Sequence, residues 1–361
     1  MKVLLLGGTG TISLPITRKL IERGDEVIVF NRGKRSAEPI DGVRYVTGDR
    51  KDVESFTRSM KENGPYDCVI DMICYGPDEA NVDVEVFAGL TKQLIFCSTV
   101  DVYRKDCLSE YLALPAAETT EFKPRPSFSY AVNKVKCEEI FAAAQKRGEF
   151  AVTVIRPGLT YREGGSPLHP FRGGSYHLDR IVKRKPIILH GDGTSLWTAC
   201  HSEDASVAFV NAAGNSAAYG KGYTVASSRW MSWEYYWWAT ARALGVSEVE
   251  FVHIPTDVLE RVAPNLSSWI PVHFQFHAIF DTTAAETELG FRNTIPWEEG
   301  AERCIAWFRS NGGFENSDNY PAYDRLVAAW RGSIDEIAKS LEGVEGLWFN
   351  ASKVSVPGGP K

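Results

Sequence analysis

Short apolar runs alternate with longer amphipathic stretches through the first 160 residues. A short apolar run bounded by turn residues is typical of a buried strand, and apolar positions three or four apart are typical of a helix. The alternation predicts an α/β fold, a doubly wound parallel sheet with helices on both faces. The predicted strands are Lys2–Leu6, Glu26–Phe30, Val43–Thr47, Cys68–Ile73, Gln93–Cys97 and Val152–Arg156, and the predicted helices are Ile12–Arg23, Val53–Asn63, Asn81–Leu90 and Tyr130–Arg147.

The pattern changes after about residue 160. The stretch Gly164–Gly174 is rich in glycine, proline and histidine, and all ten tryptophans lie after residue 196. Either the tryptophans fill the core of a smaller lobe, or one or two of them form aromatic walls of a substrate site. We divide the chain into a sheet domain over 1–165, completed by parts of 185–230, and a mainly substrate-binding lobe over 166–350. The Pro-Gly-Gly-Pro tail over 351–361 is expected to be disordered.

Composition and charge narrow the function classes. A chain of 361 residues with 44% hydrophobic and 24% charged residues is ordinary for a globular protein, and no stretch approaches a membrane span. The net charge of −6 argues against a nucleic-acid partner. Seven scattered cysteines without a Cys-x-x-Cys pair indicate reduced thiols. With no targeting segment recognised ahead of the first strand, we expect a soluble, cytoplasmic protein.

No metal centre is predicted. The sequence has neither a His-Glu-x-x-His motif nor a Gly-x-Ser-x-Gly motif, so zinc hydrolysis and serine hydrolysis lack support. His273 and His277 are four residues apart and have aromatic neighbours. For this pair we favour packing or substrate hydrogen bonding over metal binding.

A glycine-rich segment, Gly7–Ser13, lies between the first predicted strand and the first predicted helix. A pyrophosphate binds at a helix N-terminus, where backbone N–H groups are free and glycines allow close approach. The third glycine of this fingerprint is replaced by Ser13, whose small side chain still permits close packing. The sequence therefore predicts a dinucleotide site that uses Gly7, Gly10, Thr11 and Ile12.

The residues after the second strand bear on the choice of cofactor. An NAD site places a carboxylate there for the ribose 2′-hydroxyl, but this chain has Asn31 and Arg32, with Arg35 close behind. Arginine binds a 2′-phosphate through charge-assisted hydrogen bonds, so we predict NADP, with NAD as the second choice. Asp49, after the third strand, is a weaker candidate for the adenine amino group.

Two further segments supply candidate chemistry. Ser98–Tyr103 follows the fifth strand, and Tyr130 and Lys134 are four residues apart on a predicted helix, so they share a face. An ammonium beside a phenol favours the phenolate, so we expect Lys134 to lower the pKa of Tyr130. A tuned tyrosine exchanges a proton with a carbinol or carbonyl oxygen while a nicotinamide exchanges hydride with the carbon.

These motifs together resemble the extended short-chain dehydrogenases/reductases, the NAD(P)-dependent epimerase/dehydratase family. Gly7–Ser13, Ser98–Tyr103, Tyr130–Lys134, Arg156-Pro157 and Gly191–Gly193 are similar to its motifs, in order and over nearly the whole chain. The resemblance implies a Rossmann-type sheet of seven strands, a smaller C-terminal substrate lobe and a homodimer. It implies Thr99 as the catalytic hydroxyl, Tyr130 as acid/base, Lys134 as tuner and ribose ligand, Pro157 at the nicotinamide, and substrate contacts from His169, Arg172, Trp197 and His201.

Two departures from the family pattern concern the substrate. Trp197 stands where nucleotide-sugar members carry an arginine for the substrate diphosphate. Val100-Asp101 follows the catalytic threonine where 4,6-dehydratases carry Asp-Glu, so a complete dehydratase mechanism is less favoured. Asp101 is either an additional base or a loop or helix cap.

The sequence thus predicts an NADP-dependent oxidoreductase or epimerase that transfers hydride at a secondary alcohol or ketone of a sugar-like small molecule. The alternative is a non-catalytic nucleotide-binding module, such as a redox sensor or an RNA-binding relative.

Overall fold

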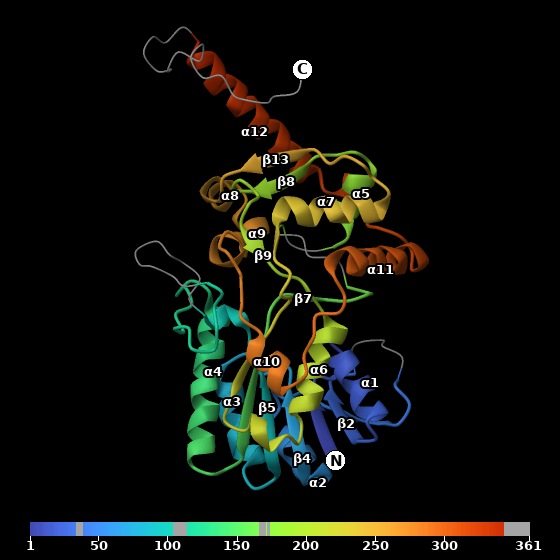
Figure 1. The fold of residues 1–361 in the computed structure, drawn as a ribbon, viewed down its shortest axis with the longest axis vertical. Helices are drawn as coiled ribbons and strands as arrows, with labels where there is room; N and C mark the ends of the chain where they lie inside the picture. The colour runs from blue at the N-terminus through green and yellow to red at the C-terminus, as the bar shows by residue number, and fades with distance from the viewer. Residues whose placement is uncertain (34–38, 104–113, 166–170, 172–173, 343–361) are drawn as a thin grey trace. The chain divides into compact units, whose positions relative to one another are not determined.

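The central sheet has the predicted architecture (Figure 1). The structure, a computed structural model, describes residues 1–33, 39–103, 114–165, 171 and 174–342. Within these residues seven strands form one parallel sheet, in the order β11-β6-β5-β4-β1-β2-β3. Their bounds are β1 Lys2–Leu6, β2 Glu26–Asn31, β3 Val43–Thr47, β4 Tyr66–Asp71, β5 Thr91–Cys97, β6 Ala151–Pro157 and β11 Gly222–Val225.

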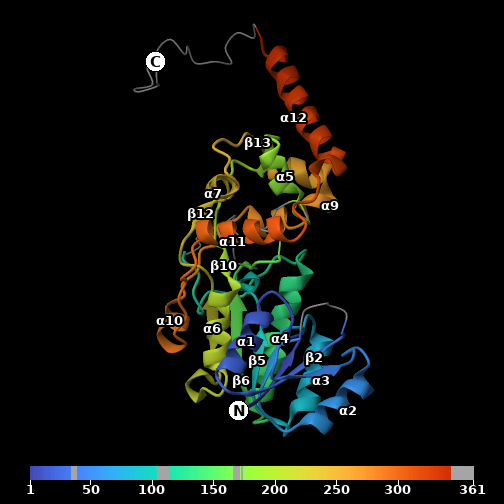
Figure 2. The ribbon, with the colours of Figure 1, turned by 90° about the vertical axis from the view of Figure 1, so that its right-hand side faces the viewer.

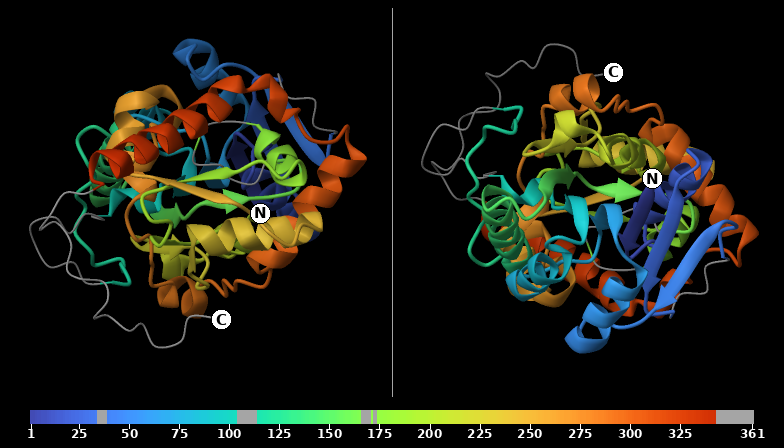
Figure 3. Two further views of the ribbon diagram at one scale, coloured as in Figure 1. Left: turned by 90° about the horizontal axis from the view of Figure 1, so that it is seen from above. Right: turned by 90° about the horizontal axis from the view of Figure 1, so that it is seen from below.

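Helices cover both faces of this sheet (Figures 2 and 3). Because side chains alternate along a strand, Val3 and Leu5 of β1 face the layer of α1 and α6, whereas Leu4 and Leu6 face the other layer. Both sets are fully buried, as expected for a parallel sheet. The covering helices are α1 Ser13–Glu22 and α6 Ser202–Ala212 on one face, and α2 Val53–Asn63, α3 Pro77–Phe87 and α4 Ser129–Lys146 on the other.

The predicted bounds of β1, β3 and α2 are confirmed, but β4 and α3 begin and end earlier than predicted. β4 ends at Asp71 because its carboxylate Oδ1 accepts the N–H of Ile73, at 2.7 Å, and turns the chain. α3 begins at Pro77, whose missing N–H costs little in the first turn. The Glu79 carboxylate accepts the N–H of Gly76 at 3.2 Å and completes this helix start.

An aromatic core holds the C-terminal lobe together. The rings of Trp197 and Trp233 stack with centroids 4.1 Å apart, and those of Tyr236 and Trp297 stack at 4.3 Å. These tryptophans are buried, so the core interpretation is confirmed for them. The lobe elements are α5 Tyr176–Val182, β8 Ile187–His190, β9 Leu196–Trp197, β12 Met231–Ser232, α7 Trp233–Leu244, β13 Phe251–Ile254, α8 Thr256–Val262, α9 Pro264–Ser267, a π-helical turn η3 Ile270–Phe274 and α11 Trp297–Ser310.

Several segments from the second half of the chain return to the sheet. α6 and β11 do so, both from within 185–230, and α10 (Thr283–Glu288) packs its Ala285 on the same face as α6. The chain divides into two compact units, Met1–Glu315 and Asn316–Lys361. The boundary expected near residue 165 therefore lies inside the first unit and does not separate two units.

The second unit contains, in its described part, the short turn η4 (Ser317–Asn319) and α12 (Pro321–Ser340). The tail predicted over 351–361 lies outside the described residues. Among the helices of the described segments, none combines the length and the apolar character that crossing a membrane requires. The six cysteines in the described part of the chain are buried free thiols.

Candidate functional site

A cavity of about 620 Å³ lies at the carboxyl ends of the central strands. This is the edge at which open parallel sheets bind their ligands. The cavity extends from the glycine-rich loop to the N-terminal half of α4, and its lining includes nine of the predicted cofactor residues. These are Gly7, Gly10, Thr11, Ile12, Asn31, Arg32, Asp49, Tyr130 and Lys134.

The glycine-rich loop leaves room for a phosphate group. Gly7 has φ +88°, and a Cβ there would lie 2.5 Å from Cγ2 of Ile73, so only glycine fits. Ser13 holds the loop in shape, because its hydroxyl donates to the Gly7 carbonyl at 2.5 Å and accepts the Gly10 N–H at 2.7 Å. The serine at the third fingerprint position thus fastens the loop, a role that the sequence did not reveal. The loop and the cavity fit a dinucleotide.

Polar side chains line the part of the cavity at the carboxyl ends of β2 and β3. Asn31 ends β2 and accepts the N–H of Gly33 at 2.8 Å, while the exposed Arg32 lies beside it. Asp49 and Lys51 also line this end, and sequence reasoning missed the second cation, Lys51. Arg35 lies outside the described residues.

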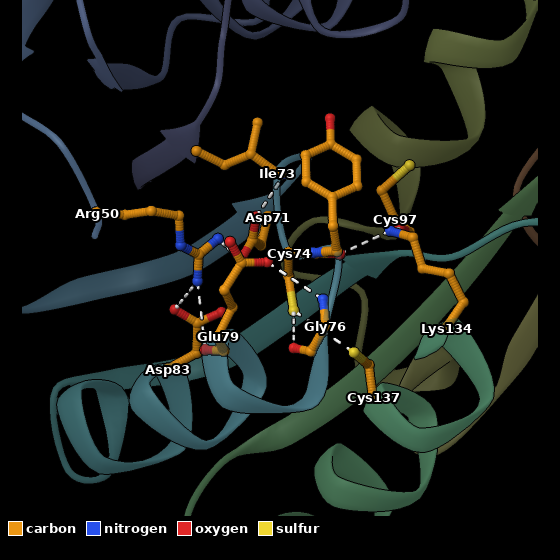
Figure 4. A network of polar contacts seen from close by, with 11 residues as sticks. Arg50, Asp71, Ile73, Cys74, Gly76, Glu79, Asp83, Cys97, Lys134 and Cys137 are labelled. Atoms are coloured by element: carbon orange, nitrogen blue, oxygen red, sulfur yellow. Dashed lines mark hydrogen bonds and ion pairs between the residues drawn. The ribbon is translucent and has the colours of Figure 1, made fainter. Parts of the chain in front are cut away.

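A buried ionic triad lies beneath the cavity (Figure 4). The Arg50 guanidinium contacts Asp71 at 3.0 Å and Asp83 at 2.9 Å. Burial, and then the negative charge of Asp71, raise the pKa of Asp83 well above its ordinary value. Burial alone would raise the pKa of Asp71 too, but Arg50 and hydrogen bonds from Asp83 and Ile73 hold it below its ordinary value. The two carboxyl groups therefore share one proton beside Arg50, and the triad is neutral.

The triad fixes the loop after β4, and this loop holds Lys134 (Figure 4). Asp71 accepts the N–H of Ile73, and the next residue, Cys74, offers its carbonyl to Nζ of Lys134 at 2.7 Å. The carbonyl of Cys97, at the end of β5, accepts from the same Nζ at 2.7 Å. Lys134 is 2% exposed, so its ammonium is held between the ends of two strands and not on the surface.

Tyr130 lines the cavity one helical turn before Lys134. Nζ of Lys134 lies 5.7 Å from the centroid of its ring. Burial of the phenol, followed by the charges of Cys97 and Asp101, raises the pKa of Tyr130, and a hydrogen bond with Thr99 opposes this shift. The pKa of Tyr130 is thus raised where the sequence predicted a lowering, because burial of the phenol is the largest effect on it.

Asp101 connects the sheet domain to the C-terminal lobe. Its Oδ2 accepts the hydroxyl of Thr99 at 3.1 Å, and its backbone N–H donates to the same hydroxyl oxygen at 3.2 Å. Its Oδ1 forms a hydrogen bond with Nδ1 of His273, in η3. Nδ1 of His277 instead accepts the backbone N–H of Leu196 at 3.0 Å, so the two histidines have separate partners.

A second buried ion pair holds α4 against the sheet. Arg156, in β6, contacts the Glu138 carboxylate on α4 at 2.7 Å, and Ser98 donates to that carboxylate at 2.5 Å. Tyr103 accepts from Arg156 at 3.1 Å. Glu138 lies one turn beyond Lys134 on α4, so this network fixes the helix that carries Tyr130. Sequence reasoning did not find it.

The predicted substrate residues require corrections. Trp197 is 2% exposed and stacks in the lobe core, and His201 is fully buried, with Nδ1 accepting the N–H of Glu203 at 3.2 Å. Neither lines the cavity, because packing of the lobe takes up both side chains. Pro157 is buried at the end of β6 and does not line it either. His169 and Arg172 lie outside the described residues.

Trp269 is an aromatic residue that sequence reasoning did not single out at this site. Its ring is 41% exposed and lies 6.3 Å from the ring of Tyr130 and 5.2 Å from that of Phe128. In the sequence, the signal that could have pointed to Trp269 was its position four residues before His273. A flat apolar surface therefore stands beside the phenol.

The chain belongs to the NAD dependent epimerase/dehydratase family, whose model matches residues 3–226. It is 28% identical to 2′-dehydrokanamycin reductase of Streptomyces kanamyceticus, over 68% of this chain and 67% of that one. It is also 28% identical to the chloroplast stem-loop binding protein of 41 kDa b of Arabidopsis thaliana, over 70% of this chain and 65% of that one. The UDP-glucose 4-epimerase of Thermotoga maritima has a similar fold, with TM-score 0.68 and 19% identity over 86% of this chain and 99% of that one.

Replacing Gly7 by alanine is expected to weaken NADPH binding by at least about tenfold, because the new Cβ strains the backbone and meets Ile73. Gly24→Ala is the matched control: Gly24 has φ +86° but nothing within 4 Å of an added Cβ. Fluorescence titration with NADPH measures both variants. Equal affinity in Gly7→Ala and the wild type would contradict the prediction that this loop binds the pyrophosphate.

Asp83→Asn is expected to change the free energy of unfolding by less than about 1 kcal/mol at about pH 4, near the ordinary pKa of aspartate, since an amide resembles the protonated carboxyl group. The raised folded-state pKa means that the stability linked to Asp83 is lost as pH rises from the ordinary aspartate range through that pKa. The variant should therefore lose less stability than the wild type over this pH range.

The double variant Asp71→Asn/Asp83→Asn leaves Arg50 without a counter-charge and should cost about 3–5 kcal/mol. Urea unfolding at several pH values measures both variants. A large loss in the single variant would show that Asp83 is ionised.

Proposed function

We propose that the protein is an NADP(H)-dependent reductase that converts a ketone of a sugar-like small molecule into a secondary alcohol. The observation that carries the proposal is that Tyr130 and Lys134 both line the cavity, with Nζ of Lys134 5.7 Å from the centroid of the Tyr130 ring. Two relatives carry reductase names, 2′-dehydrokanamycin reductase and 2-alkyl-3-oxoalkanoate reductase of Stenotrophomonas maltophilia, the second 26% identical.

The residues divide the work of one hydride and one proton transfer. The reduced nicotinamide supplies the hydride to the carbonyl carbon when it is bound. Tyr130 supplies the proton to the carbonyl oxygen, so the ketone gains two electrons and two hydrogens. Lys134 would hold the nicotinamide ribose. The Gly7–Ser13 loop holds the pyrophosphate through backbone N–H groups.

The contacts of Asp101 favour reduction over the other family reactions. A neutral phenol, the ordinary state of a tyrosine at neutral pH, can deliver the one proton that ketone reduction needs. A 4,6-elimination needs a further free acid or base, whereas Asp101 is already engaged by Thr99 and His273. An epimerase cycle uses the same tyrosine in both directions and is the second choice within the family.

The substrate class follows from the surface beside Tyr130. Trp269 offers a half-exposed ring, and a flat apolar face binds the face of a sugar ring. Trp197, at the position where nucleotide-sugar members carry an arginine, is buried in the lobe core and supplies no anchor for a diphosphate. We therefore propose a sugar without a nucleoside diphosphate, in the manner of an aminoglycoside. A homodimer and a cytoplasmic location remain predictions.

An RNA-binding module is the second candidate. One relative is named a chloroplast stem-loop binding protein, and it is as similar in sequence as the first reductase. Against this role stand the net charge of −6 and the grouping of Thr99, Tyr130 and Lys134, which binding of RNA does not need. RNA binding that weakens steeply with salt, without turnover, would favour this candidate.

Tyr130→Phe is expected to lower kcat by at least about 100-fold, since a general acid contributes that much, and to leave the NADPH dissociation constant within about threefold. The assay follows NADPH oxidation with 2′-dehydrokanamycin and a panel of keto-sugars. Tyr219→Phe removes an exposed hydroxyl outside the cavity and serves as the control. Full activity in Tyr130→Phe would rule out the proposed acid.

Arg32→Asp is expected to weaken NADPH binding by about 10- to 100-fold and to leave NADH binding within about threefold, because the loss falls on the 2′-phosphate. Arg58→Asp makes the same charge change on α2 at an exposed position outside the cavity. Titration of both variants with both nucleotides separates the effects. Equal losses for NADPH and NADH would contradict the predicted cofactor preference.

A further inference from the structure

Three polar groups form a chain from Thr99, near Tyr130, to the C-terminal lobe. The Thr99 hydroxyl is hydrogen-bonded to Asp101, and Asp101 to His273. Asp101 and His273 are separated by 172 positions in the sequence. Their side chains are 7% and 8% exposed, so their hydrogen bond is shielded from water. Within the described part of the chain, this hydrogen bond is the polar contact that joins η3 to Asp101 and, through Asp101, to Thr99.

The number of protons determines the direction of each hydrogen bond. A threonine hydroxyl has one proton to donate, and the proton of Thr99 is directed to Oδ2 of Asp101. The Asp101 N–H already donates to the Thr99 oxygen. A further partner of this hydroxyl must therefore donate to its oxygen, and the neutral phenol of Tyr130 has the proton to do so.

His273 determines how firmly this arrangement is held. Its Nδ1 is the partner of the second oxygen of the same carboxylate, so it keeps Asp101 turned with Oδ2 toward Thr99. The imidazole is packed between aromatic rings, with centroids 4.7 Å from Phe274 and 6.4 Å from Trp269. η3 is a turn of π-helix, a rare conformation that occurs often at functional sites.

We propose that His273 is a positioning residue for proton transfer: by orienting Asp101 it directs the Thr99 hydroxyl and, through it, the proton of Tyr130. The inference rests on the proposed reductase function and adds a residue from the C-terminal lobe to it. A ketone oxygen that enters beside Tyr130 then meets a Thr99 hydroxyl whose proton already has a fixed direction. The same hydrogen bond makes the geometry of the acid depend on correct docking of η3.

Two substitutions of His273 separate hydrogen bonding from packing. His273→Leu removes the donor to Asp101, and kcat for NADPH-dependent ketone reduction should fall about 10- to 100-fold, the effect of one hydrogen bond to a charged acceptor. His273→Asn retains an N–H close to the position of Nδ1 and should keep kcat within about threefold of the wild type. The NADPH dissociation constant should stay within about twofold in both variants, which also shows that they are folded.

Asp101→Asn tests the same contact from the other side. Its amide cannot accept from both neighbours, so kcat should fall about as far as in His273→Leu. The double variant Asp101→Asn/His273→Leu should be no worse than Asp101→Asn alone, because both changes remove one interaction. His177→Leu removes another buried imidazole of the lobe, on α5, and should leave kcat unchanged.

A spectroscopic readout needs no substrate. In protein labelled with ¹³C at the tyrosine Cζ atom and saturated with NADP⁺, the resonance that disappears in Tyr130→Phe reports on this phenol. Its chemical shift should change in His273→Leu and in Asp101→Asn, but not in His273→Asn or in His177→Leu.

The proposal is overturned if His273→Leu retains both the wild-type kcat and an unchanged Tyr130 resonance. It is also overturned if kcat falls as far in His273→Asn as in His273→Leu. A third contrary result would be a double variant in which the kcat losses of Asp101→Asn and His273→Leu add. Failure of the reductase function itself is a different result. In that case the wild type itself would not reduce the ketones, or Tyr130→Phe would reduce them as fast as the wild type. Loss of activity in Tyr130→Phe together with an unaffected His273→Leu would overturn the positioning role alone.

Discussion

The site depends on one buried ammonium group. Nζ of Lys134 donates to the carbonyls of Cys74 and Cys97, and thereby joins α4 to the ends of β4 and β5. It also lies 4.7 Å from the ring centroid of Phe96 and 5.1 Å from that of Tyr75. Carbonyl oxygens and aromatic faces together replace the water that a charged lysine loses on burial. Tyr130 is placed at the cavity because the next turn of its helix is anchored in this way.

Two buried ionic networks keep that anchor in position. Arg50 with its two carboxyl groups fixes the loop that supplies the Cys74 carbonyl (Figure 4), and the pair of Arg156 and Glu138 fixes the helix that supplies Lys134. Buried ion pairs of this kind add little net stability compared with well-packed apolar residues, but breaking one is costly. Their evident effect here is geometric, since each connects a strand end to a neighbouring helix or loop at the cavity.

The C-terminal lobe completes the site through a few contacts rather than through its core. Its tryptophans Trp197 and Trp233 stack inside the lobe and hold it together. Trp269 and His273, in contrast, lie at the edge that meets the sheet domain, one beside Tyr130 and the other hydrogen-bonded to Asp101. On the proposed function, this division separates two parts of the site: the cavity for the dinucleotide belongs to the sheet, and the surroundings of Tyr130 are set by the lobe.

The sequence alone determined the sheet, the glycine-rich loop and the residue types at the cavity, because each depends on local periodicity or on a motif that is continuous in the chain. Lys2–Leu6 and Gly7–Ser13 could be assigned without any distant contact. Only the tertiary structure decided that Trp197 and His201 are buried, that Lys134 binds carbonyls from two strands, and that His273 meets Asp101. These contacts join residues far apart in the sequence. A spacing pattern carries no record of which side chains packing brings together, or of how burial changes their pKa values.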